Sequence, residues 1–93
     1  MTTINKGANK FYVGENIQNP LAEITFVESG EKRLVIDHTY VSSDLRGQGV
    51  AGQLVDNVVQ YAREEGKKIL PLCPYAKDKI EKNEDYHDVL SKY

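Results

Sequence analysis

A glycine-rich segment with one arginine lies in the middle of the chain. It runs Ser42-Ser43-Asp44-Leu45-Arg46-Gly47-Gln48-Gly49-Val50-Ala51-Gly52. Glycines let a ligand approach the backbone closely, and the first turn of a helix offers unpaired N–H groups with a partial positive charge. Together with the fixed charge of Arg46, they predict a site for a phosphate or pyrophosphate. The alternative is a tight strand-to-helix turn that needs glycine only for its backbone.

Two familiar phosphate-binding patterns fit this segment poorly. Gly47-x-Gly49-x-x-Gly52 matches the dinucleotide fingerprint, but that fingerprint needs an acidic residue about 20 positions later. Leu72 and Cys73 stand there instead, and the chain is too short for the second half of a dinucleotide fold. A Walker loop fails as well, because no Lys-Ser or Lys-Thr follows the glycines. Dinucleotide binding is therefore disfavoured.

The segment before the glycines has the patterning of β-strands. Apolar and polar residues alternate over Leu21–Val27, and further apolar runs occupy Lys10–Val13 and Leu34–Val41. The turn signal Glu28–Glu31 contains a glycine and separates the two longer runs. Two such runs joined by a short loop predict an antiparallel hairpin.

After the glycines the apolar period becomes helical, which predicts a helix over Val50–Glu65 that is closed by Gly66. Its apolar stripe consists of Val50, Ala51, Leu54, Val55, Val58, Val59 and Ala62. Lys68–Cys73 then predicts a strand buried on both faces, and Pro71 favours an edge or bulged position for it. Tyr75–Leu90 predicts one helix or two short ones.

This order of elements, β-β-β-α-β-α, predicts the α+β class. A strand, a helix and a second strand in one sheet should form a right-handed parallel crossover, whereas the preceding hairpins are antiparallel. We expect a small mixed, mainly antiparallel sheet with a C-terminal helix. Residues 1–93 should form a single domain, since a chain of this mass can bury about 64 per cent of its surface.

Composition excludes several classes of protein. Hydrophobic residues make up 40 % and charged residues 28 %, as in folded proteins. The net charge of −2 argues against nucleic acid or an anionic membrane as a partner. No apolar run approaches the roughly 18 residues of a membrane span, and the N-terminus has no secretory apolar region. Cys73 is the only cysteine, which favours a reducing cytoplasm.

The glycine-rich segment also reads as Arg46-x-x-Gly49-x-Ala51, and here the sequence resembles the GNAT superfamily of acyl-CoA-dependent N-acetyltransferases. The loop pattern of that family is Gln or Arg, x, x, Gly, x, Gly or Ala. The predicted strand before it and helix after it strengthen the likeness. His38–Val41 and Pro71-Leu72-Cys73-Pro74-Tyr75 further resemble a short GNAT subfamily of about this length. The likeness covers Phe11 to Tyr86.

The resemblance implies acetyl-CoA as co-substrate and no metal. Backbone amides of the loop would bind the pyrophosphate of coenzyme A, through Arg46, Gly47, Gln48, Gly49, Val50, Ala51 and Gly52. The backbone of Tyr40 and Val41 would pair with the pantetheine arm, in a gap where this strand splays from Lys68–Cys73. Lys79 and Lys82 belong to a mixed-charge run typical of an exposed helix face. Either could approach the 3′-phosphate, although nothing local requires it.

Acetyl transfer needs a neutral amine, a hydrogen-bond donor for the thioester oxygen and a proton for the departing thiolate. Cys73, at the end of the strand expected to face the thioester, could be a nucleophile, an acid or a packed core thiol. His38 could accept the proton of the amine, or be a hydrogen-bonded strand residue. Tyr75 could protonate the thiolate or only pack. Two distant histidines without neighbouring ligands predict no metal site.

We therefore expect a cytoplasmic acetyl-CoA-dependent N-acetyltransferase with an unidentified amine as acceptor. The alternative is a non-catalytic acyl-CoA-binding or interaction module. Ordinary GNAT enzymes, as the resemblance implies, carry helices after the first strand that help wall the acceptor site. Here only Gly14–Pro20 lies there, which is too short for that pair of helices. An open acceptor face would suit a bulky or protein-borne amine, or a partner that completes the pocket.

Overall fold

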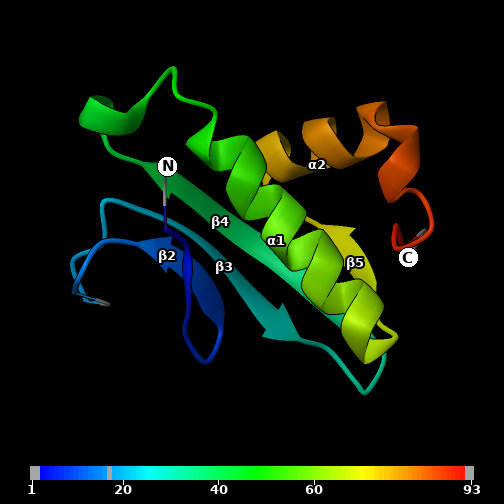
Figure 1. Cartoon of the computed structure of the whole chain (residues 1–93). Helices are drawn as coiled ribbons and strands as arrows, with labels where there is room; N and C mark the ends of the chain where they lie inside the picture. The colour runs from blue at the N-terminus through cyan, green and yellow to red at the C-terminus, as the bar shows by residue number, and fades with distance from the viewer. Residues whose placement is uncertain (1–2, 17, 92–93) are drawn as a thin grey trace.

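The computed structural model describes residues 3–16 and 18–91 (Figure 1). Within them the chain forms one sheet whose strands lie in sequence order, from β1 to β5. The elements are β1 (Asn5–Lys6), β2 (Lys10–Val13), β3 (Ala22–Glu28), β4 (Arg33–Val41), α1 (Val50–Glu65), β5 (Lys68–Pro71) and α2 (Pro74–Lys82), with 3-10 turns at Ser43–Leu45 and Glu84–Tyr86. Neighbouring strands are antiparallel except β4 and β5, which are parallel. The predicted α+β class with a mixed, mainly antiparallel sheet is confirmed.

One face of the sheet carries the hydrophobic core. Phe11 lies opposite Ile24 and Val13 lies opposite Ala22 in the strand register, and directly opposed residues share a face. These side chains join one buried cluster with the apolar stripe of α1, except for the partly buried Ala51, and with Ala76 and Ile80 of α2. Figure 1 shows α1 lying across the sheet. Both helices therefore bury the same face, and among the described residues no helix covers the other face.

Two expectations about the strands are wrong. The sequence predicted no strand at Asn5–Lys6, but these residues form β1 and pair with Tyr12 and Phe11. Two residues are too few to show an alternation. The strand predicted over Lys68–Cys73 ends at Pro71 and is not buried on both faces. Lys68 is exposed and Leu70 only partly buried, because both helices lie on the side of Ile69.

The C-terminal region forms two short helical elements, one of the two predicted alternatives. Helix α2 begins at Pro74 in its first turn, where the missing N–H costs nothing. After the 3-10 turn the chain returns to the sheet: Val89 is buried in the core and Leu90 bridges Ile69. The edge position expected for Pro71 is confirmed, since β5 is the last strand in the order. None of the described helices is both long and apolar enough to span a bilayer.

An aromatic cluster at the centre of the core allows a test of this packing. The rings of Phe11 and Tyr61 lie 6.0 Å and 5.8 Å from the ring of Phe26, which is 1 % exposed. We expect Phe26→Ala to lower the free energy of unfolding by about 3–5 kcal/mol, because it leaves a cavity. Val27→Ala is the matched control: Val27 is 45 % exposed on the other face, and its loss should change stability by less than about 0.5 kcal/mol. Urea denaturation checks both, and equal losses would contradict the two-layer arrangement.

Candidate functional site

The site begins where β4 and β5 part. The parallel pairing runs from Arg33 opposite Lys68 to Ile36 opposite Pro71. The N–H groups of Leu72 and Cys73 then both donate to the carbonyl of Ile36, at 2.9 and 3.1 Å. From there the chain turns into α2, while β4 continues to Val41 without a partner on that side (Figure 1). The structure thus has the divergence of two strands that the resemblance implied.

A bulge in β4 decides which side chains face this gap. Thr25 lies opposite His38, but the next residue, Phe26, lies opposite Ile36, so Asp37 is an extra residue. The carboxylate of Asp37 accepts a hydrogen bond from the Thr25 hydroxyl at 2.5 Å. Such bulges change the side-chain alternation along a strand.

The bulge leaves His38 and Thr39 on opposite faces. Thr39 lies opposite the buried Ile24 and therefore faces the core side. His38 is exposed on the face without helices. The structure therefore does not place His38 beside Cys73, whose side chain belongs to the core cluster.

Cys73 is buried and stands at the N-cap of α2, just before Pro74. Its Sγ lies 3.4 Å from Oγ1 of Thr39. Burial raises the pKa of the thiol, but the Thr39 hydroxyl and the N–H groups of Ala76 and Tyr75 outweigh it, and the net pKa is lowered. The thiol does not cap the helix by a side-chain hydrogen bond, and these amides act on it as oriented dipoles at the helix N-terminus.

The glycine-rich loop joins the end of β4 to α1. Gly47 and Gly49 have φ angles of 84° and 74°, in the left-handed region that favours glycine. A Cβ at either position would meet nothing within 4 Å, so the need for glycine comes from the backbone conformation. Gly49 is the N-cap of α1, and its first turn has no side-chain cap hydrogen bond. The N–H groups there remain available to an anion.

Arg46 is exposed, and its Nε donates to the carbonyl of Val41 at 3.3 Å. This contact joins two residues that the sequence assigned to different parts of the cofactor, the pyrophosphate and the pantetheine arm. The N–H of Ser42 donates to the carbonyl of Leu21, the residue before β3. Successive residues of a strand point their backbone N–H and C=O groups to opposite sides. The backbone groups of Tyr40 therefore point toward β3, and those of Thr39 and Val41 point toward the gap.

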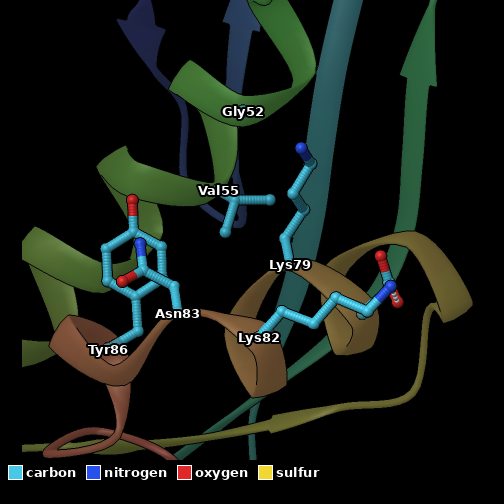
Figure 2. Close-up of a pocket in the computed structure, with 7 residues that line it drawn as sticks. Gly52, Val55, Lys79, Lys82, Asn83 and Tyr86 are labelled. Carbon is cyan, nitrogen blue, oxygen red and sulfur yellow. Dashed lines mark ion pairs between the residues drawn. The ribbon is translucent and has the colours of Figure 1, made fainter.

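A pocket of about 370 Å³ lies between α1 and α2. It is lined by Gly52, Val55, Asp78, Lys79, Lys82, Asn83 and Tyr86. In Figure 2 the side chain of Lys79 extends from α2 in the direction of Gly52 on α1. Lys82 forms an ion pair with Asp78 at 2.8 Å. The pocket therefore has two lysines, Lys79 and Lys82, on its α2 side and Gly52 on its α1 side.

Tyr86 closes the other end of this pocket. Its hydroxyl donates to Oδ1 of Asp56 at 3.0 Å. Burial and then this hydrogen bond raise the pKa of Tyr86. Sequence reasoning missed Tyr86 and Asn83, because the pocket is formed by packing between distant segments.

The remaining predicted site residues are divided between the two sides of the gap. Tyr75 follows Cys73 on α2 and is 37 % exposed, with the Lys79 ammonium 5.7 Å from its ring centroid. Tyr40 is 42 % exposed and lies opposite Glu23 on β3.

Thr39 was missed by the sequence analysis, although the strand alternation beside Ile24 could have indicated it. Within the described residues, no three His, Cys, Asp or Glu side chains gather as metal ligands.

Comparisons with known proteins agree with this geometry. The sequence profile of the GCN5-related N-acetyl-transferase family matches residues 10–89. N-acetyltransferase 8B of Rattus norvegicus is 42 % identical over 55 residues, which are 57 % of this chain and 25 % of that protein. The chain therefore spans about a quarter of this curated relative.

Solved structures give the same fold. The NMR structure of a GCN5-like putative N-acetyltransferase from Staphylococcus aureus is 44 % identical, with a TM-score of 0.82 over 97 % of this chain and 88 % of that one. Rv2747 from Mycobacterium tuberculosis, solved in complex with CoA, has a TM-score of 0.57 at 12 % identity, over 86 % of this chain and 56 % of that one. At that identity the likeness is one of fold alone. The profile match over residues 10–89 decides the family, and the chain belongs to the GCN5-related N-acetyltransferases.

Proposed function

We propose that this chain, with residues 1–93 acting as one acyl-CoA-binding domain, transfers an acetyl group from acetyl-CoA to an amine. The observation that carries the proposal is a chain of contacts along the end of β4. Arg46, in the loop before the uncapped first turn of α1, bonds Val41 of β4. Two residues earlier in the same strand, Thr39 contacts the thiol of Cys73. A thioester that carries phosphate groups needs an anion site for the phosphates at one end and reactive groups for the thioester at the other.

In this proposal the loop from Arg46 to Gly52 binds the pyrophosphate through its backbone amides. Arg46 leaves the carbonyl of Val41 and turns to the phosphates, which frees that carbonyl for the pantetheine arm. Lys79, on the wall of the α1–α2 pocket, is placed to bind a further phosphate of the cofactor. Lys82 assists from its ion pair with Asp78.

The reactive end of this chain of contacts supports a covalent route. The Cys73 thiolate attacks the acetyl carbon, its new S–C bond forms, and the S–C bond to coenzyme A breaks. The N–H of Thr39 or Val41, turned toward the gap, stabilises the oxyanion, and Tyr75 protonates the departing thiolate. The acceptor amine then attacks the acetyl-cysteine: the N–C bond forms, the S–C bond to Cys73 breaks, the amine gives up its proton to a base, and the Cys73 thiolate is released. In a direct transfer, Cys73 instead supplies the proton to the thiolate of coenzyme A.

The helix-free face of the sheet supports an open acceptor side. His38 is exposed on that face, so we assign it to the acceptor, where its imidazole takes the proton of the amine. An open face favours a bulky or protein-borne amine. We place the chain in the short subfamily marked by Pro71–Tyr75. The unpaired Cys73 is in keeping with a cytoplasmic setting.

Turnover separates this enzyme from a non-catalytic acyl-CoA-binding module. With acetyl-CoA and a panel of amines that includes lysine peptides, we expect at least one amine to accelerate release of free coenzyme A thiol. A thiol-specific dye measures the release, and calorimetry on the same protein measures binding. Binding of acetyl-CoA without amine-dependent release across the panel would favour the module instead.

Arg46→Glu tests the phosphate loop. Removing a charge-assisted hydrogen bond and adding a negative charge should weaken acetyl-CoA binding by about 1.5–3 kcal/mol, which is roughly 10- to 150-fold. The matched control is Lys32→Glu, which makes the same change of charge in the β3–β4 turn, away from the loop. Calorimetry measures both affinities. Equal affinity of Arg46→Glu and wild type would remove the loop from the proposed site.

Cys73→Ala tests the covalent route. Incubation of the wild-type protein with acetyl-CoA and no amine should leave one acetyl group on Cys73, because the acetyl-cysteine then has no acceptor. Intact-mass and peptide mass spectrometry detect it, and Cys73→Ala should stay unmodified. Amine-dependent turnover without any acetyl-cysteine would contradict the covalent route and leave direct transfer.

A further inference from the structure

Among the described residues, one side-chain hydrogen bond crosses the gap between β4 and the start of α2, that of Cys73 with Thr39. Each of these residues belongs to a different arm of the divergence. Thr39 lies in the part of β4 that has no partner in β5, and Cys73 is the N-cap of α2. The backbone of Thr39 also acts on the thiol, in the same direction as its hydroxyl. In the thiol form the sulfur donates to Oγ1 of Thr39; when the sulfur is ionised it can only accept, and the hydroxyl then becomes the donor.

His38 does not lie where it could stabilise the ionised sulfur of Cys73. His38 neighbours Thr39 in sequence, but it lies opposite Thr25 on the helix-free face, and Asp37 also bonds Thr25. The residues of α1 that share the core with Cys73 are apolar. On α2 the titratable residue nearest to Cys73 in sequence is Tyr75. The groups that lower the pKa of the thiol are accordingly uncharged: the Thr39 hydroxyl and backbone N–H groups.

We propose that Thr39 is the positioning residue for Cys73: its hydroxyl donates to the thiolate and holds the sulfur at the gap where the thioester is bound. This inference rests on the proposed function, in which Cys73 carries the acetyl group. Once the acetyl group is attached, the sulfur is a poor acceptor and the Thr39 hydroxyl is released. The thiolate form of Cys73 is thus stabilised by neutral dipoles instead of an ion pair with imidazolium.

The test is the pH dependence of thiol alkylation in the full chain, measured with iodoacetamide in the absence of acetyl-CoA. Thr39→Val keeps the shape of the side chain and removes the donor. The loss of one hydrogen bond to a charged sulfur should raise the midpoint by about one pH unit, a tenfold change in the acid dissociation constant. Thr39→Ser should restore the midpoint of the wild type. Since a more basic thiolate is also more nucleophilic, the midpoint is the readout and the limiting rate is not.

Two controls separate positioning from a general effect on the sheet. Thr25→Val removes a strand hydroxyl on the opposite face, and His38→Gln removes the neighbouring imidazole. Both should leave the midpoint of Cys73 unchanged. If Thr39→Val does not fold, Thr39→Ala and Thr39→Ser give the same comparison, because they differ by one hydroxyl.

Equal midpoints in the wild type and the variants without the hydroxyl would overturn the role of Thr39. A midpoint that moves in His38→Gln by as much as in Thr39→Val would overturn it too. Neither result depends on acetyl transfer. The proposed function fails by a different observation, the lack of amine-dependent release of coenzyme A, so the two failures are distinguishable.

Discussion

The carbonyl of Ile36 accepts the N–H groups of both Leu72 and Cys73, and the parallel pairing of β4 with β5 ends at this bond. Beyond it, β4 has backbone groups on one side with no strand to satisfy them. Unpaired backbone groups bind water or a ligand, so the end of pairing itself creates a polar surface inside the sheet. The thiol, the loop arginine and the first turn of α1 all lie along that surface. Their relation to one another depends on where the two strands part.

The placement of both helices on one face of the sheet also shapes the candidate site. It gives α1 and α2 a shared core and leaves a pocket between them, bordered by Lys79 and Tyr86. It also gives the two sides of the gap different character. The side with the helices holds the buried thiol of Cys73, whereas the other side carries the exposed side chains of His38 and Tyr40. A donor and an acceptor that approach from different sides would meet only at the gap.

The sequence predicted the helix Val50–Glu65 with its observed bounds, because its apolar period and the glycine after it are local signals. It also predicted the loop, since left-handed backbone at Gly47 and Gly49 requires a particular residue type. The relation of His38 to Cys73 could not be predicted in the same way. It depends on the bulge at Asp37. The bulge changes the face of the sheet to which each later side chain of β4 points, and no local pattern of apolar and polar residues marks it. The end of β5 at Pro71 likewise depends on the Ile36 carbonyl, a partner that is distant in sequence.

The return of the chain to β5 after α2 has a consequence for how this small protein behaves in a crowded solution. The outward-facing backbone of β5 belongs to Ile69 and Pro71. The N–H of Ile69 donates to the carbonyl of Val89, its carbonyl accepts from Ser91, and Pro71 has no N–H to offer. At the opposite end of the sheet, β1 is only two residues long. Exposed strand edges are the usual templates for adding a foreign strand. The two outermost strands of the sheet, β1 and β5, are thus poor templates for edge-to-edge pairing.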